Sequence, residues 1–182
     1  MGSSMNVAAI LYEGDQGELT DALLTDVAYQ FRHAGVKLAG AVQSKSAPRP
    51  NRCEMTLEDL ATGQCIKTSD DRAPPEPGCR LDANALEDSV GLAASSLDPA
   101  TELVIINRFG KRESDGNGFR PLIESAVFLQ VPVLVGLKRV HFEAWRDFVG
   151  DDLVFLPQRR EDILGWCAAA MSESAAERAA AS

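Results

Sequence analysis

The chain has 182 residues, of which 45% are hydrophobic and 25% are charged, and its formal net charge is -9 at pH 7. A chain of this length buries roughly 70% of the surface that its unfolded form exposes, so we expect one core. The negative charge argues against general attraction to nucleic acid or anionic lipid. No apolar stretch approaches the ~20 residues of a membrane span, and no signal-peptide pattern is present, so we expect a cytoplasmic protein without membrane insertion.

The first predicted strand runs from Asn6 to Tyr12 and enters a glycine-containing turn. A helix follows, with apolar residues at helical spacing, and Gly35 is predicted to end it. Asp15 and Glu18 are predicted to form a capping box at its start. The second strand is expected over residues 36–42, followed by a basic loop over residues 43–52.

A hairpin is predicted from residues 53–57 and 65–68, with its turn near residues 62–63. Three prolines then mark an exposed loop over residues 70–78, and Asp82 is predicted to cap a helix that ends near Ser96. The four cysteines stand at wide and unequal spacings, which predicts free thiols and no zinc site; these are Cys53, Cys65, Cys79 and Cys167.

The second half continues with a strand from Leu103, a helix over 120–130, a strand over 131–137, a short helix over 141–148 and a strand over 153–156. Helices that alternate with apolar strands predict a mostly parallel sheet covered on both faces, here with an inserted hairpin. The expected fold class is therefore a three-layer α/β fold. Residues 6–170 are expected to form this single domain, and residues 171–182 a frayed helix or a disordered tail.

The strand from Leu103 leads directly into a polar segment that begins with Asn107 and Arg108. In open α/β sheets, ligands bind at the carboxyl ends of the strands. A P-loop nucleoside triphosphatase needs acidic residues here, to hold Mg²⁺ and to activate water. The sequence therefore suggests a nucleotide-hydrolase scaffold whose catalytic carboxylates have been replaced.

The turn after the first strand is predicted to be a degenerate phosphate loop. Gly14 matches the first glycine of the motif, but Leu19 stands at the second glycine, Thr20 at the lysine and Asp21 at the hydroxyl position. This stretch contains several acidic residues, which leaves three interpretations. It is a metal site, a turn reshaped for a different ligand, or a solvated helix start. The predicted loop residues are Gly14, Asp15, Gly17 and Thr20.

Basic residues gather in the loop after the second strand and in the loop after Asn107. If these two strands flank the first strand, both loops meet over one cleft and form an anion-binding patch. The alternative is that the basic loops are merely solvated. The candidate ligand-binding residues are Asn107, Arg108, Lys111, Glu113, Arg52, Arg49 and Arg80.

The chain resembles the bacterial family catalogued as domain of unknown function 2478, from Asn6 to about Leu156. The motifs that carry the resemblance are Ala8-Ala9-Ile10-Leu11-Tyr12, Asp21-Ala22-Leu23-Leu24, Gly40-Ala41-Val42-Gln43, Cys79-Arg80-Leu81-Asp82 and Ile106-Asn107-Arg108-Phe109-Gly110-Lys111-Arg112-Glu113 with Gly116 and Gly118. That family in turn resembles small P-loop nucleoside triphosphatases with an Asp-Glu-Ile-Gly-Lys-Met-Glu segment, which implies that the three-layer α/β fold is of the P-loop NTPase-like type. Gly110, Lys111 and Glu113 match this segment, whereas Asn107 and Arg108 do not.

Genes of this family often lie beside molybdate-transport genes, so the resemblance implies a role in molybdenum or tungsten handling. Molybdate is a tetrahedral dianion, and a cleft lined by Asn107, Arg108, Lys111 and Arg52 is chemically suited to it. The ligands considered are therefore molybdate, tungstate, or a nucleotide with Mg²⁺.

Three functions remain open from the sequence. The first is a regulatory protein that binds an oxyanion or a nucleotide without efficient hydrolysis, in which Arg108→Ala or Lys111→Ala weakens binding with little effect on stability. The second is a nucleotide hydrolase or transferase, in which Asp15, Glu18 or Asp21 holds a metal and Glu113 acts as the base. The third is an interaction module for a transporter subunit; a homo-oligomer is also considered.

Overall fold

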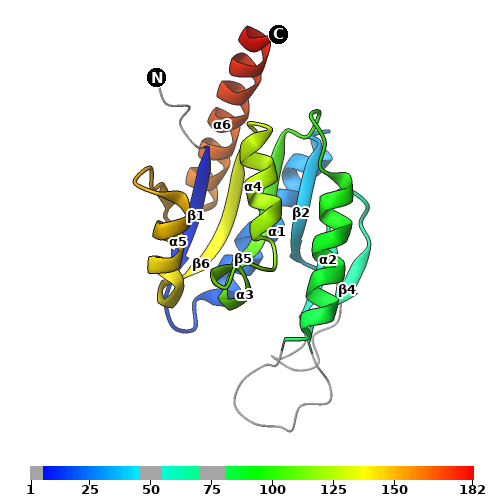
Figure 1. The fold of residues 1–182 in the computed structure, drawn as a ribbon, viewed down its shortest axis with the longest axis vertical. Coiled ribbons are helices and arrows are strands. Elements are labelled where there is room, and N and C mark those ends of the chain that lie inside the picture. The colour runs from blue at the N-terminus through cyan, green and yellow to red at the C-terminus, as the bar shows by residue number, and fades with distance from the viewer. Residues whose placement is uncertain (1–5, 46–54, 70–80) are drawn as a thin grey trace, which may run out of the picture.

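The strands form a mixed sheet in the order β4-β3-β2-β5-β6-β1-β7 (Figure 1). The structure is a computed structural model that describes residues 6–45, 55–69 and 81–182. Neighbouring strands from β2 to β7 in this order run parallel, and β3 and β4 extend the β2 edge in antiparallel fashion. The strands are β1 (Val7–Tyr12), β2 (Leu38–Gln43), β3 (Thr56–Asp59), β4 (Cys65–Lys67), β5 (Leu103–Phe109), β6 (Val133–Lys138) and β7 (Phe155–Leu156).

Helices cover both faces of the sheet, as predicted. Helices α2, α4 and α5 pack on one face, and α1 and α6 pack on the other (Figure 1). The helical elements are α1 (Gly17–His33), α2 (Ala83–Ser96), α3 (Lys111–Ser114), α4 (Arg120–Phe128), the 3-10 turn η1 (Arg139–His141), α5 (Phe142–Val149) and α6 (Arg160–Ala181). The predicted α/β class with an inserted hairpin is therefore confirmed.

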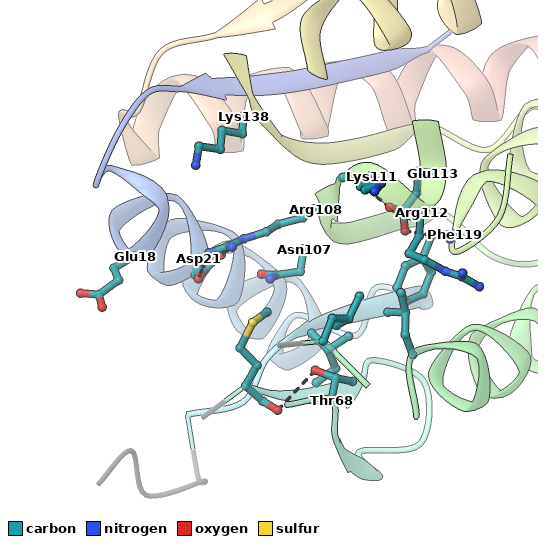
Figure 2. A pocket seen from close by; sticks show the side chains of 15 residues that line it. Glu18, Asp21, Thr68, Asn107, Arg108, Lys111, Arg112, Glu113, Phe119 and Lys138 are labelled. Carbon is teal, nitrogen blue, oxygen red and sulfur yellow. Dashed lines mark hydrogen bonds and ion pairs between the residues drawn. The ribbon is translucent and has the colours of Figure 1, made fainter. Parts of the chain in front are cut away.

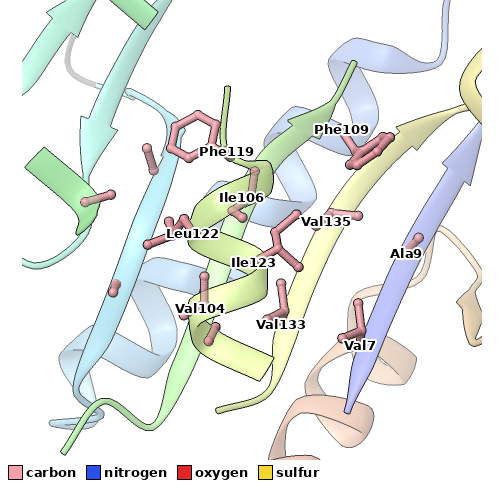
Figure 3. Close-up of a cluster of buried hydrophobic side chains, with 14 of the residues drawn as sticks. Val7, Ala9, Val104, Ile106, Phe109, Phe119, Leu122, Ile123, Val133 and Val135 are labelled. Atoms are coloured by element: carbon pink, nitrogen blue, oxygen red, sulfur yellow. The ribbon is translucent and has the colours of Figure 1, made fainter. Parts of the chain in front are cut away.

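The two cores follow from the alternation of side chains along the buried strands. Val104 and Ile106 of β5 face α4, where Leu122 and Ile123 pack against them (Figure 3). Ile105, the residue between them, faces the opposite core. Both faces of β5 are thus apolar, which is why its sequence reads as a continuous hydrophobic run.

The predicted start of α2 is confirmed. Asp82 caps α2, because its side chain accepts hydrogen bonds from the backbone N–H groups of Asn84 and Ala85. Cysteines 65 and 167 are free thiols, and burial raises the pKa of the Cys167 thiol to about 12. Cysteines 53 and 79 lie outside the described residues.

Other expectations need correction. The predicted capping box is wrong, because α1 begins at Gly17 after Gln16 and its start has no side-chain cap. The segment 111–114 is a short helix where a loop was expected, and the helix from residue 160 was not predicted. Residues 171–181 continue that helix, and Arg178 donates a 2.9 Å hydrogen bond to the carbonyl oxygen of Pro99.

The strand arrangement on which the predicted anion-binding patch depended is not found. Strand β2 pairs directly with β5, with Ala41 opposite Ile106, whereas β1 lies beyond β6. The two strands thus do not flank β1. Among the described helices, none combines the length and the apolar character needed to cross a membrane.

Candidate functional site

A cavity of about 480 Å³ lies at the carboxyl edge of the sheet (Figure 2). It is enclosed by α1, the β3-β4 hairpin, the start of α2, the ends of β5 and β6, and the segment from α3 to α4. This is the location at which open α/β sheets bind ligands. The lining residues are Glu18, Asp21, Met55, Leu57, Thr68, Leu81, Leu86, Asn107, Arg108, Gly110, Lys111, Arg112, Glu113, Phe119 and Lys138.

A β-bulge shapes the wall of the cavity at Asn107 and Arg108. Ile106 pairs with Val135 and Phe109 pairs with Leu137, so β5 carries one more residue than β6 between these pairs. A β-carbon at Gly136 would lie 2.4 Å from the carbonyl oxygen of Asn107. Glycine at position 136 therefore leaves the space that the bulge occupies.

We expect Gly136→Ala to lower the free energy of unfolding by about 3 kcal/mol, because the new methyl group overlaps a backbone oxygen in the centre of the sheet. Urea denaturation measures the loss. The matched control is Gly91→Ala in α2, where no atom lies within 4 Å of the position that a β-carbon would take and helix propensity favours alanine. Equal stability of Gly136→Ala and the native chain would show that the bulge tolerates the added carbon.

The Arg108 side chain is directed to Asp21 on α1 (Figure 2). Its Nε donates to Oδ1 of Asp21 at 3.3 Å, and its Nη2 donates to Oδ2 at 2.8 Å. The Asp21 side chain is only 5% exposed, so this bidentate pair neutralises a buried charge. The guanidinium also lies 5.8 Å from the centre of the Tyr12 ring.

Asn107 lies beside Arg108 and lines the cavity (Figure 2). The residue is 2% exposed, and its side-chain oxygen is buried without a hydrogen-bond partner in the part of the chain that the structure describes. Buried polar atoms in native proteins usually have a partner. The carboxamide is thus available to a guest in the cavity.

Cationic side chains border the cavity at two of its sides. Lys111 on α3 and Lys138 at the end of β6 are exposed, and no ion pair or hydrogen bond of either ammonium occurs within the described segments. Arg112, by contrast, is paired with Glu87 at 3.1 Å. The two lysines therefore supply positive charge that an anion can use.

The Glu113 carboxylate is engaged by the backbone. The N–H of Gly110 donates to Oε2 at 2.9 Å, and the N–H of Phe119 donates to Oε1 at 3.0 Å. Burial raises the pKa of Glu113, and these two amides partly oppose the shift. A β-carbon at Gly118, whose φ is 57°, would lie 2.2 Å from Oε1. These contacts favour a positioning role for Glu113, which joins the starts of α3 and α4.

We expect Glu113→Gln to lower the free energy of unfolding by about 2 kcal/mol near neutral pH, because the new NH₂ group faces a backbone donor. Because the folded carboxyl has a raised pKa, its contribution to stability decreases as pH rises from about 4.5 through the folded pKa. The stability difference between the native chain and the variant should shrink over that range. Denaturation at several pH values measures it, with exposed Glu124→Gln as control; a difference that grows with pH contradicts the assignment.

The turn after β1 borders a second cavity of about 340 Å³, which shares Glu18, Arg108 and Lys138 with the first. The turn spans only residues 13–16 before α1 begins, so it is shorter than a phosphate loop. Its hydrogen bonds are partly internal, since the N–H of Gln16 donates to the carbonyl oxygen of Glu13 and the N–H of Glu13 donates to Oε1 of Gln16. Glu18 stands where the helix begins, and its charge opposes a triphosphate.

The residues of the predicted phosphate loop do not all line the same cavity. Gly14, Asp15 and Gly17 line the second cavity, and a β-carbon at Gly17 would lie 3.1 Å from Nη2 of Arg108. Thr20 is fully buried and accepts a 2.8 Å hydrogen bond from Nε2 of Gln158. Thr20 is therefore a packing residue of α1 and does not line the described cavities.

The structure does not offer Mg²⁺ the ligands that a P-loop enzyme uses. Asp21 is bound to Arg108, and the apolar run of β5 is followed by the neutral amide of Asn107. No cluster of three or more His, Cys, Asp or Glu side chains able to hold a metal occurs in the described ranges. The residues present do not fit a Mg²⁺-nucleotide complex at this turn.

The predicted site is brought together in part. Asn107, Arg108, Lys111 and Glu113 all line the larger cavity. The candidates Arg49, Arg52 and Arg80 lie outside the described residues. Lys45, at the start of the predicted basic loop, is paired with Asp26 and does not line the cavity. Lys138 was missed, although it directly follows the apolar run of β6 as Asn107 follows that of β5.

Comparison with solved structures shows that the chain has a P-loop NTPase-like α/β fold. A human cancer-related nucleoside triphosphatase aligns with a TM-score of 0.56 and 14% identity, covering 91% of this chain and 96% of its own. THEP1 from Aquifex aeolicus aligns with a TM-score of 0.57 and 18% identity, covering 87% and 95%. Identities this low show the shared fold alone.

The family follows from the sequence match. Residues 7–166 match the model of the family described as protein of unknown function (DUF2478), and the chain belongs to that family. A relative from Bradyrhizobium diazoefficiens, named molybdenum import ATP-binding protein ModC 2, is 34% identical over 162 residues. The match covers 88% of this chain but only 18% of that relative.

Proposed function

We propose that this chain is a binding protein on an NTPase-like scaffold, which holds a small anionic ligand without hydrolysing a nucleotide. The observation that carries the proposal is the Arg108-Asp21 pair. In the motif comparison, Asp21 stands at the hydroxyl position of the phosphate loop, and Arg108 stands where P-loop enzymes carry an acidic residue. P-loop enzymes use these positions to hold Mg²⁺ and to activate water. A ligand beside this pair can be bound by three other residues that line the cavity, which are Lys111, Lys138 and Asn107 with its buried amide.

The proposed context is molybdenum import on the cytoplasmic side. This context is supported by the similarity to the relative from Bradyrhizobium diazoefficiens, which is named for molybdenum import. Molybdate and tungstate are tetrahedral dianions, which Lys111 and Lys138 would attract at the rim of the cavity. The proposed absence of nucleotide hydrolysis is tested by the release of inorganic phosphate from ATP and GTP with Mg²⁺, which we expect to equal a buffer blank.

The enzymatic alternative makes the opposite prediction for the same assay. A metal-dependent rate that is lost in both Glu113→Gln and Asp15→Asn would establish it, provided that both variants remain folded by circular dichroism. Asp15 is exposed, so its replacement tests the metal-binding role without disturbing the core. Such a rate would overturn the binding-only proposal.

A second candidate is an interaction module for a transporter subunit. It is favoured by the finding that the matching segment forms a small part of a longer protein named for molybdenum import. In that case the separate chain would associate with a transporter ATPase. Co-purification of the two proteins, with no effect of any small anion on stability, would support this candidate over the first.

A further inference from the structure

The larger cavity has more apolar surface than an inorganic oxyanion can use. Its volume of about 480 Å³ falls within the range of about 300–1,000 Å³ for pockets that hold organic ligands. One wall of the cavity is built from apolar side chains of the hairpin, of α2 and of the residue before α4: Met55, Leu57, Leu81, Leu86 and Phe119. The cations lie at the other side, on α3 and at the end of β6 (Figure 2).

Two buried carboxamides lie at the carboxyl edge of the sheet, and one of them, Asn107, lines the cavity. The side-chain oxygen of Asn107 has no partner in the described segments, and neither side-chain atom of Gln43 has one. Gln43 is 6% exposed and pairs in register with Leu57, which lines the cavity, so the two side chains project from the same face of the sheet. Within the described residues, two buried amides at one edge of the sheet therefore lack the hydrogen bonds that such groups require.

We infer that the larger cavity binds an anionic heterocycle whose ring carries a hydrogen-bond donor next to an acceptor. The Asn107 carboxamide pairs with that edge, the ring lies against Leu57 and Phe119, and the anionic group lies toward Lys111 and Lys138. This inference rests on the proposed anion-binding function and adds the class of ligand.

The chemistry of a carboxamide explains the choice. An asparagine side chain offers one acceptor oxygen and two N–H donors, and it pairs in bidentate fashion with a ring edge of that kind. Molybdate offers acceptors only, so it would leave the Asn107 oxygen unpaired. A carboxylate side chain at position 107 would instead repel the anionic group of the ligand.

The experiment is calorimetric titration of the whole chain with guanosine 5′-monophosphate, adenosine 5′-monophosphate and uridine 5′-monophosphate. Ribose 5-phosphate, inorganic phosphate and molybdate are titrated as ligands without a ring edge. We expect at least one nucleotide to bind about tenfold or more tightly than ribose 5-phosphate. Asn107→Leu should remove this difference, whereas Lys138→Gln should weaken all of the anions.

A second readout needs no ligand. If the Asn107 carboxamide makes no structural hydrogen bond, Asn107→Leu should leave the melting temperature of the free protein unchanged or raise it. The matched control is Gln64→Ala, an exposed carboxamide at the turn of the hairpin outside the cavity, which should change neither binding nor melting temperature.

The outcomes separate the two claims. Equal binding of ribose 5-phosphate and all three nucleotides would overturn the heterocycle and leave the anion-binding function standing. A clear drop in the melting temperature of Asn107→Leu would also overturn it, since the amide would then be structural. Failure of every anion to bind would overturn the proposed function itself.

Discussion

Replacement of Gly40 by alanine is expected to lower the free energy of unfolding by about 4 kcal/mol or more, which would prevent stable folding in a marginally stable chain. Gly40 lies in β2 with φ at 110°, a conformation that L side chains rarely adopt. A β-carbon there would lie 2.0 Å from the carbonyl oxygen of Ile105 in β5. Because β2 and β5 are central strands, the chain cannot move one without separating the sheet.

Gly35→Ala is the matched control, since Gly35 also has a positive φ, of 85°, but no atom lies within 4 Å of the β-carbon position. Its expected cost is about 1 kcal/mol, from backbone conformation alone. Urea denaturation of both variants separates backbone strain from steric overlap. Equal losses in the two would show that close packing of β2 on β5 does not require glycine.

Removing Arg108 is also expected to have a large effect. Arg108→Ala leaves the buried Asp21 carboxylate without its bidentate partner, so we expect a loss of about 3 kcal/mol. This differs from the sequence-based expectation of little change in stability. For Lys111, which is exposed and forms no ion pair in the described ranges, that expectation stands, with a change within about 0.5 kcal/mol.

A double-mutant cycle with Asp21→Asn and Arg108→Gln measures the pair directly. The interaction energy should be about 1–3 kcal/mol, as expected for residues in contact. The cycle with Asp21→Asn and Lys111→Gln is the control and should be additive. Additive losses in the first cycle would show that Arg108 is not committed to Asp21, and the central observation of the proposed function would fail.

Elements that depend on local patterns could be predicted from the sequence. The buried strands read as short apolar runs, and the hairpin had a recognisable turn. Asp82 was predicted as a cap because its signal lies within three residues of the helix that it starts. The same local rule, that polar residues follow buried strands at the ligand-binding edge, correctly placed Asn107 and Arg108 at a cavity.

Features that depend on long-range pairing could not be predicted. The partner of Arg108 is Asp21, which lies 87 positions away in sequence, so no spacing rule connects them. The bulge in β5 depends on space left by Gly136 in another strand. Glu113 matched the segment of the nucleoside triphosphatases, yet its carboxylate is held by two backbone amides that only the folded α3-α4 segment brings together.

The measurement that tests the central claim most directly is thermal unfolding of the purified chain with molybdate, tungstate, phosphate, ATP or GTP, each with and without Mg²⁺. A ligand at ~100 times its dissociation constant should add roughly 2.7 kcal/mol, a shift of several degrees for a chain of this size. We predict such a shift with at least one anion, unchanged when Mg²⁺ is omitted and lost when Lys111 and Lys138 are both replaced by glutamine. A shift that requires Mg²⁺ together with ATP or GTP, or no shift with any anion, would contradict the account.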